Sequence, residues 1–344
     1  MNRAALLLAD PSPCLRWLVL RDILGRTEDD SEARELVELR GADSLVTGLL
    51  TLQGPDGAWA GGDLAWPGSA DRLRATARAL VRLGYLGFGP EHPAVRRGAE
   101  YLFGKQRTDG AGDLPEDRDE AEERGTYTMV PLQTALPLRG LAACGYATDP
   151  RAEHAYDWLL AQRLLDGAWP TGIAAGNYGR VAGYRRLAHS RWGCRSNTTG
   201  ALLCLALHPD RRRSPEARRA LDLLLGRETR EQYSLGFEVA RTVGLEATRG
   251  FFTYYARFDL AQVLDLCRQV GAGLEDERVA DLVGFVRGLQ GPRGLWEYAA
   301  RPQGSRWVTF DLLRSLSRLD DAGDWLSAEP RTPFQAYPRR TRRY

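Results

Sequence analysis

Gln53-Gly-Pro-Asp56-Gly57-Ala-Trp59 is a phrase that this chain repeats. Three further copies read Gln106-Arg-Thr-Asp109-Gly110, Gln162-Arg-Leu-Leu-Asp166-Gly167-Ala-Trp169 and Gln290-Gly-Pro-Arg-Gly294-Leu-Trp296. Their glutamines are 53, 56 and 128 residues apart, and the last interval is close to two periods, which predicts a degenerate copy near Gly226. Such a period indicates one supersecondary unit repeated along the chain.

Each phrase follows an apolar run with helical periodicity, and Asp-Gly then ends the helix because Gly accepts the left-handed conformation of a C-terminal cap. The Trp ring can fold back over the helix end, and the Gln amide can bind backbone groups that have no partner there. The phrases therefore predict a structural role at the ends of helices.

Helical segments of two kinds alternate between the phrases. A helix that is apolar all round must be buried, while one with a charged face lies outside. The alternation predicts an all-α fold, a closed (α/α)6 toroid, as one domain over 1–328 followed by an Arg-rich tail at 329–344. The sixth outer element would be the weak segment after Asp320. The apolar inner segments are 12–25, 72–84, 127–145, 196–207, 256–272 and 304–319, and the amphipathic outer segments are 31–52, 92–106, 150–163, 214–226 and 276–290.

Loop lengths predict which end of the toroid is functional. Connections from an inner to an outer segment are short, whereas those from an outer to an inner segment are long, as in 107–126, 164–195 and 227–255. Long loops usually carry function. They all decorate the rim where the inner helices begin, and six helix N-termini there favour an anionic group. We expect the site at this rim.

Composition sets bounds on partners and location. The net charge is only +2 and Lys105 is the only lysine, so nothing indicates nucleic acid as a partner. The five cysteines are odd in number and never form C-x-x-C, which argues against a disulfide framework. The apolar run Ala4–Ala9 is too short for a signal peptide or a membrane span. A reducing cytoplasm is the expected location.

The chain resembles the terpenoid cyclase and protein prenyltransferase superfamily, the α/α toroids that include squalene-hopene cyclase. The phrases above are similar to that superfamily's QW repeats, and the helix alternation covers about 12–320. Segments such as Trp307-Val-Thr-Phe-Asp311-Leu-Leu and Arg257-Phe-Asp259-Leu-Ala-Gln look most similar to bacterial single-domain squalene-cyclase-like proteins. The resemblance implies an isoprenoid or another apolar small molecule as the partner.

The superfamily's two chemistries are not evident in this chain. Squalene-hopene cyclases use an Asp-x-Asp-Asp acid motif, which is absent here; Glu28-Asp29-Asp30 and Asp320-Asp321 are partial look-alikes that we interpret as capping charges. Prenyltransferase β subunits bind zinc through an Asp-x-Cys pair and a later His. Asp265-Leu-Cys267 matches the pair, but no His follows His208, so we expect no metal and no cofactor.

Aromatic residues and arginines concentrate in the rim loops and the starts of the inner segments. Aromatic faces bury hydrocarbon and can stabilise a carbocation, and arginine binds carboxylate or phosphate. The pattern suits an isoprenoid with an anionic head. The candidate substrate-binding residues are Arg257, Tyr127, Gln133, Trp192, Arg195, Tyr254, Tyr255, Phe258 and Trp307.

Three residues are candidates for catalysis. Asp259 and Asp311 each open an inner segment after aromatic residues, where desolvation would raise a carboxyl pKa and make a general acid or base. We expect Arg257 and Asp259 to act together on the polar end of the substrate. Cys194 lies beside Arg191 and Arg195 at a helix start, which favours a thiolate nucleophile.

Three kinds of function remain open. The first is a terpene cyclase-like enzyme without the Asp-x-Asp-Asp acid, acting on an isoprenoid-like molecule. The second is a non-catalytic toroid that binds a ligand or partner. The third is a carbohydrate-active α/α toroid, which would need paired carboxylates, and only Asp259 and Asp311 occupy matching positions.

Overall fold

The inner ring consists of six mainly buried helices. The computed structural model describes residues 3–27, 29–64, 71–112, 130–173, 176, 178, 179, 181, 185–227, 233–246 and 258–319. In α10, every residue from Arg195 to Ala206 is buried, as expected for a helix without a polar face. The inner helices are α2 (Pro13–Asp22), α5 (Arg72–Tyr85), α8 (Val130–Leu141), α10 (Arg195–Leu207), α13 (Leu260–Val270) and α15 (Gly304–Leu319).

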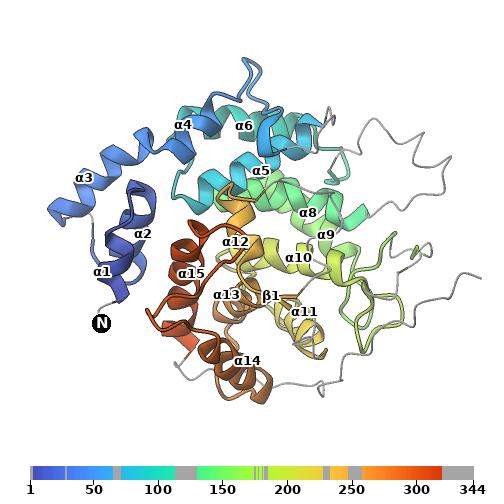
Figure 1. The fold of residues 1–344 in the computed structure, drawn as a ribbon. Coiled ribbons are helices and arrows are strands. Elements are labelled where there is room, and N and C mark those ends of the chain that lie inside the picture. Colours follow the sequence, from blue (N-terminus) through green and yellow to red (C-terminus); the bar gives the residue numbers. More distant parts are fainter. Residues whose placement is uncertain are drawn as a thin grey trace, which may run out of the picture.

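Outer helices cover this ring, each packed on the inner helix that precedes it (Figure 1). Proline occupies a first-turn position in α6, α9 and α11, where its missing N–H costs nothing. The chain is therefore an α/α toroid of the predicted class, and its sixth outer position falls outside the described residues. The outer helices are α3 (Ser31–Leu39) with α4 (Ser44–Leu50), α6 (Pro93–Gly104), α9 (Pro150–Ala161), α11 (Pro215–Leu225) and α14 (Glu277–Gly288).

The first outer segment differs from its prediction, because 31–52 is two helices and not one. A 3-10 turn, η1 (Arg40–Ala42), ends α3, and the Asp43 side chain then accepts from Leu45 N to start α4. A single stretch of amphipathic sequence does not reveal such a break, since Asp43 also fits a helix surface.

Helix α2 contacts the chain directly after α5, and α15 contacts α2 to close the ring. The Trp17 side chain lies against Gly87, where a Cβ atom would come within 2.2 Å of the Trp17 ring. Gly87 also has φ +87°, which favours glycine. Arg40 Nη1 donates to the carbonyls of Leu86 and Gly87, which ties α3 to the same corner.

Smaller elements complete the described chain: α1 (Arg3–Leu8), η2 (Gly62–Leu64), a π-helical turn η3 (Ala142–Tyr146), α12 (Phe237–Thr242), and strands β1 (Tyr233–Ser234) and β2 (Phe258–Asp259). The strands are parallel and pair Ser234 with Asp259. Helix α12 was not predicted, and it lies in the middle of the ring, in contact with α5, α13 and α15 (Figure 1). It fills the centre of the toroid on the side of the long loops.

The repeated phrases form four clasps: 53–59, 106–112, 163–169 and 290–296. In three of them a fully buried Trp donates its indole N–H to the carbonyl ten residues earlier, at 2.7–2.8 Å. The Trp backbone N–H donates to a Thr on the next inner helix, at 2.9–3.0 Å. Each clasp thus fixes the end of one outer helix to the start of the following inner helix.

The third clasp corrects one detail of the sequence pattern. Leu164 N donates to Ala168 O, matching Gly54 N to Ala58 O in the first clasp, so Arg163 and not Gln162 stands at the glutamine position. In the other three clasps the glutamine Nε2 donates to the carbonyl of the turn glycine. The degenerate copy expected near Gly226 has only its helix end described, with Gly226 at the C-cap of α11.

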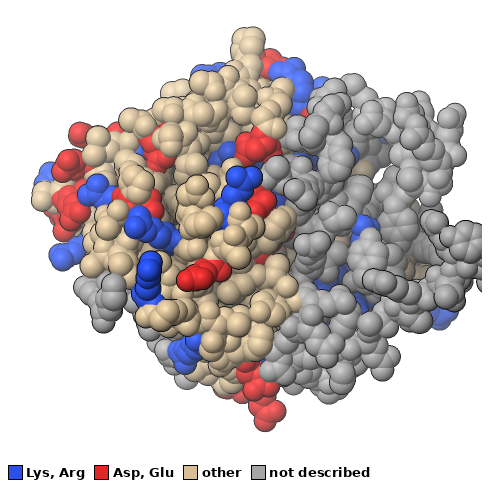
Figure 2. Space-filling model, viewed as in Figure 1, with Lys and Arg blue, Asp and Glu red and all other residues tan. Residues whose placement is uncertain are grey.

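Basic and acidic side chains are interspersed over the described part of the face in Figure 2. This mixture agrees with the small net charge of +2. No helix in the described ranges has the length and apolar character needed to cross a membrane.

Candidate functional site

A cavity of about 200 Å³ lies inside the ring. Residues from all six inner helices and from α12 line it, so it occupies the central space of the toroid. Its lining residues on α5, α8 and α10, such as Tyr85, Arg139 and Leu207, stand in the last part of those helices. Several of them are partly exposed to solvent, so the cavity opens toward the C-terminal ends of the inner helices, with α12 at its other end.

The cavity has two chemically different walls. Aliphatic and small residues predominate on the wall of α5, α8, α10 and α12, which also carries Tyr85, Arg139, Glu238 and Thr242. Charged and amide side chains form the wall of α2, α13 and α15. The first wall includes Val81, Gly84, Ala143, Leu203 and Leu207, and the second includes Arg21, Gln262, Asp265, Arg268, Gln269, Asp311 and Arg314. A ligand in this space meets hydrocarbon on one side and polar groups on the other.

Asp311 is the centre of the polar wall. Its side chain is buried, and Oδ1 accepts from the Tyr85 hydroxyl at 3.2 Å and from Arg314 Nη2 at 2.5 Å. Arg314 Nη2 also lies 3.6 Å from Asp265 Oδ1. The carboxylates of two neighbouring inner helices thus share one guanidinium.

The two carboxyl groups have opposite pKa shifts. Burial raises the pKa of Asp311 to about 6, with Arg314 opposing the shift and Asp265 adding to it. Burial also acts to raise the pKa of Asp265, but Arg268 and Arg314 outweigh it and hold that pKa below its usual value. Pairs of titratable groups whose pKa values are driven apart are typical of an acid and a base in one site. This pair can provide one protonated and one ionised carboxyl at the same pH.

Three of the four arginines that line the cavity are paired with acids of the same region. Arg268 binds Asp265 at 2.7 Å, Arg314 binds Asp311, and Arg21 binds Asp22 at 2.5 Å. Arg314 also lies 3.6 Å from Asp22. Since these positive charges have protein partners, the geometry suits a neutral ligand better than a diphosphate.

The position of this cavity differs from the sequence-based expectation, which placed the site at the N-terminal rim. Long outer-to-inner loops were the basis of that prediction, but α12, which belongs to one of them, folds into the ring and occupies that end of the central space. Loop length alone does not distinguish a loop that borders the opening of a cavity from one that fills the end of the ring. Much of the rim lies outside the described residues.

Asp259 has a structural position. It is the N-cap of α13, and its oxygens accept from the backbone N–H groups of Ala261, Gln262, Gly236 and Glu238 and from the Ser234 hydroxyl, at 3.1–3.3 Å. Burial, and then Glu238, raise the pKa of Asp259 to about 6, although the backbone donors oppose the shift. It joins α12 to α13 and does not line the cavity described above. The Asp259–Asp311 pair required for a carbohydrate-active site is therefore not assembled here.

Asp311 does not open its helix as expected, because α15 begins at Gly304 and Asp311 lies in its middle. Trp307 is buried one turn earlier, and its ring centroid lies 6.1 Å from that of Tyr85. Of the predicted site residues, Asp311 lines the cavity and Trp307 supports a lining residue.

Other predicted residues do not line the cavity. Cys194 is the buried N-cap of α10, and Arg195 is the buried first residue of that helix, where burial and Arg227 lower its pKa. Gln133 is buried near the start of α8. Trp192 is 40% exposed and stacks on Tyr178 with ring centroids 5.6 Å apart. No common site joins these four residues in the described structure.

The remaining candidates fall outside the described residues. Tyr127, Tyr254, Tyr255 and Arg257 are not described, and only the backbone of Phe258 is, in β2. The expected joint action of Arg257 and Asp259 and the 329–344 tail lie outside them too. Among the described lining residues Tyr85 is the single aromatic one, so the aromatic lining stays a prediction about the undescribed part.

Sequence reasoning missed Tyr85, Arg268, Arg314 and Glu238, and considered Asp265 only as a zinc ligand. A signal was available: Asp265-Leu-Cys-Arg268 and Asp311-Leu-Leu-Arg314 repeat one Asp-Leu-x-Arg pattern on the two last inner segments. Asp and Arg three apart lie on the same helix face. Both pairs form ion pairs, and both face the cavity.

Asp265, which together with Cys267 matches the first part of the zinc motif, lies in an ion pair, and Cys267 lies in the hydrophobic core. Asp265 binds Arg268 and Gln269, and Cys267 is fully buried, which raises its thiol pKa. Over the described ranges, no three His, Cys, Asp or Glu side chains gather as a metal-ligand set.

Residues 22–184 match the family model of the squalene-hopene cyclase C-terminal domain. This match covers two of the six inner helices, α5 and α8, and agrees with the clasps and the alternating helices. Just under half of the chain is thus similar to the squalene-hopene cyclase family. No curated protein matches the chain.

Solved structures are only weakly similar to this chain. A protein from Actinoplanes is 17% identical with a TM-score of 0.42, over 93% of this chain and 88% of that one. The type II terpene cyclase MstE from Scytonema is 17% identical with a TM-score of 0.34, over 79% of this chain and 95% of that one. A variant of that enzyme in complex with geranylgeranyl dihydroxybenzoate is 16% identical, also with a TM-score of 0.34, over 79% of this chain and 94% of that one. TM-scores this low do not bear on the function of the present chain.

Proposed function

We propose that the chain is a cyclase-like enzyme that binds a small, neutral, isoprenoid-like molecule in the central cavity and protonates it with Asp311. The observation that carries the proposal is the Asp311–Arg314–Asp265 group, which has one raised and one lowered carboxyl pKa on the wall of a cavity of about 200 Å³. The superfamily resemblance supports an isoprenoid as the class of substrate.

Cavity size supports a small substrate. A cavity of about 150 Å³ holds benzene, so about 200 Å³ accommodates a body of roughly ten non-hydrogen atoms. That is the size of a ten-carbon isoprenoid and far below that of squalene. Because the cavity opens at one end, a longer chain can extend through the mouth beside Leu207 and Gln269.

Asp311 supplies the proton in this proposal. Among the described residues both hydrogen bonds to its carboxyl group go to Oδ1, so the proton of the neutral form belongs on Oδ2. That proton passes to one carbon of a substrate double bond, and the adjacent carbon becomes a carbocation. Attack by a second double bond or a hydroxyl and loss of a proton to Asp311 complete an isomerisation or cyclisation without any other reactant. Arg268 and Arg314 keep the Asp265 carboxylate ionised, and its negative charge stabilises the carbocation.

Non-catalytic binding is the second candidate. The pairing of Asp265 with Arg268 and of Asp311 with Arg314 favours it, because a completed ion-pair network also stabilises a scaffold. The cavity and its two walls would then select the ligand without chemistry.

A product assay separates the two candidates. Neutral isoprenoid alkenes, alcohols and epoxides of five to fifteen carbons are incubated with the protein, and the extracts are analysed by gas chromatography with mass spectrometry. We expect cyclised or isomerised products, and a fall of about 10²–10⁴-fold in rate for Asp311→Asn. Asp149→Asn, at the exposed cap of α9, is the matched control and should keep full activity. Full activity in Asp311→Asn would show that Asp311 is not the acid. Binding without turnover of any substrate would favour the non-catalytic binding protein.

A further inference from the structure

We propose that the second clasp is a binding site for a free indole-type ring, a planar bicyclic aromatic molecule with an N–H donor. The site is separate from the central cavity and does not depend on the function proposed above. Its basis is a comparison of the four clasps within this one chain.

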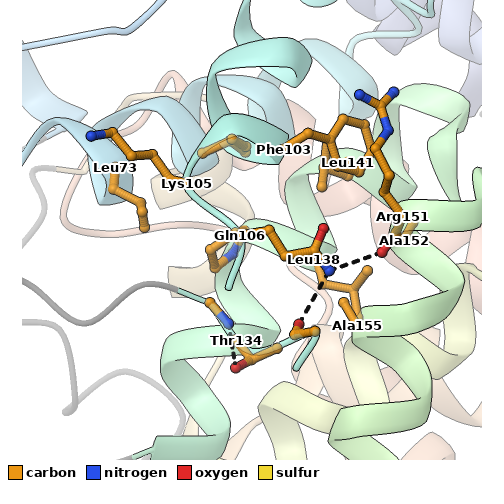
Figure 3. Close-up of a pocket in the computed structure, with 14 residues that line it drawn as sticks. Leu73, Phe103, Lys105, Gln106, Thr134, Leu138, Leu141, Arg151, Ala152 and Ala155 are labelled. Carbon is orange, nitrogen blue, oxygen red and sulfur yellow. Dashed lines mark hydrogen bonds between the residues drawn. The ribbon is translucent and has the colours of Figure 1, made fainter. Parts of the chain in front are cut away.

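Gly112 stands where the other clasps have tryptophan. In those clasps the tryptophan backbone N–H donates to Thr76, Thr198 or Thr309 on the next inner helix. Gly112 N makes the same bond to Thr134 Oγ1, at 2.9 Å. The second clasp also keeps its glutamine contacts, since Gln106 Nε2 donates to the carbonyls of Gly110 and Arg151 (Figure 3). Over the described residues, the second clasp differs from the others in having no tryptophan ring at this position.

The surroundings of the missing ring are also preserved. The carbonyl equivalent to Leu49, Leu159 and Val286, which accept the indole N–H elsewhere, is that of Leu102. Gln53 donates to Ala94 O and Gln106 donates to Arg151 O, so these two outer-helix residues occupy equivalent positions. Four residues further on, Ala155 is therefore equivalent to Gly98. A Cβ atom added to Gly98 would lie 2.5 Å from the Trp59 ring. Both positions have small side chains that leave room for a ring.

An apolar pocket marks this place (Figure 3). Leu102, Leu138, Leu141, Ala152 and Ala155 line it, and the side chains of Lys105 and Arg151 border it. Its volume is about 20 Å³, enough for one water-sized molecule, so a ring can enter only if the lining side chains move apart. Lys105 and Arg151 are both solvent-exposed and long. Arg151 binds Asp149 and Glu100 and lies over the Phe103 ring, so an incoming ring must displace it from these contacts to enter.

The ring cannot come from position 112 without moving the neighbouring helix. A Cβ atom on Gly112 would lie 2.7 Å from the carbonyl oxygen of Gln133, in the first turn of α8. An incoming ring needs no such atom. It can stack between the leucines and Ala155 and donate its N–H to Leu102 O, as the chain's own indoles do at the other clasps.

Thermal unfolding in the presence of indole tests the site. We expect the melting temperature of the full chain to rise with indole in the millimolar range, and 1-methylindole, which has no N–H, to bind roughly five- to tenfold more weakly because one hydrogen bond is lost. Ala155→Leu fills the ring position and should abolish the rise. An absent rise, or the same rise in Ala155→Leu, would overturn the proposal.

A second measurement does not depend on the stability of that variant. Crystals of the unaltered protein are soaked with 5-bromoindole, and the bromine is located by anomalous diffraction. The proposal expects the bromine in the pocket beside Leu102 and Ala155. Bromine at other positions alone, or at none, contradicts it.

Discussion

Asp259 shows how one residue can look catalytic and be structural. It follows aromatic residues at the start of an inner helix and has a raised pKa, but its two oxygens accept five hydrogen bonds that join β1, α12 and α13. Desolvation of a capping carboxylate raises its pKa as desolvation in an active site does. The pKa shift therefore distinguishes a site only together with free space beside the carboxyl group.

Replacing Asp259 should destabilise the fold. We expect Asp259→Ala to lower the free energy of unfolding by about 2 kcal/mol, because it removes a helix cap and leaves buried N–H groups without their acceptor. Asp149→Ala removes a more exposed cap and should cost about 0.5–1 kcal/mol. Urea unfolding of both variants measures the difference. Equal losses in the two variants would show that the bonds to α12 contribute nothing.

Asp311 should give the stability a characteristic dependence on pH. Burial raises its pKa to about 6 in the fold, above the roughly 3.9 of an unfolded chain. Between about pH 4 and 6 the folded state then binds more protons than the unfolded state, so the free energy of unfolding falls as pH rises through this window. Asp311→Asn cannot ionise and should lack this part of the fall.

Urea unfolding from pH 4 to 8, on wild type and Asp311→Asn, tests this sign. Asp259 titrates in both proteins, so the difference between their curves isolates Asp311. A difference that stays constant with pH, or that changes in the opposite direction, would contradict the assignment.

At the scale of the element, the clasps were predictable because their chemistry is local. Asp-Gly turns, a Gln amide and an indole within one phrase are sufficient to form the helix-end contacts. The shift of register in the third clasp and the helix α12 were not predictable. The register of the third clasp depends on the carbonyl to which Leu164 N donates. Helix α12 depends on hydrogen bonds to Asp259, which lies more than twenty residues further along the chain.

Tryptophan 169 should contribute to stability and not to the proposed chemistry. We expect Trp169→Ala to lower the free energy of unfolding by about 3–5 kcal/mol, since the ring is fully buried. Trp169→Phe keeps most of the apolar surface and loses the bond to Leu159 O, which costs about 1 kcal/mol or more. The same holds for Trp59.

The matched control is Trp192→Ala, because that ring is 40% exposed and should cost less than about 1 kcal/mol. Differential scanning calorimetry measures all three variants. An unchanged melting temperature in Trp169→Ala would show that the clasp does not hold the helix ends.

At the scale of the whole molecule, the toroid followed from the alternation of buried and amphipathic helices. All six inner-helix starts lie within four residues of the prediction. The position of the central cavity did not follow, because the alternation of helices does not show which end of the ring a loop segment closes. Helix α12 closes the end that loop lengths favoured, so the cavity opens at the end with short connections. Asp311 was predicted as a candidate. Its contact with Tyr85 was not, because it depends on how α5 and α15 pack in the complete ring.

The central claim is that a small isoprenoid-like molecule binds inside this ring, through its mouth at the C-terminal ends of the inner helices. The most direct test is isothermal titration calorimetry with a ten-carbon isoprenoid alcohol on wild type, Leu207→Trp and Leu165→Trp. Leu207 lines the mouth, whereas Leu165 is fully exposed on a clasp turn. We predict one-to-one binding to wild type and to Leu165→Trp, and at least about tenfold weaker binding to Leu207→Trp, because an indole in the mouth occupies the path of the ligand. Equal affinity in Leu207→Trp, or no binding to wild type, would contradict the claim.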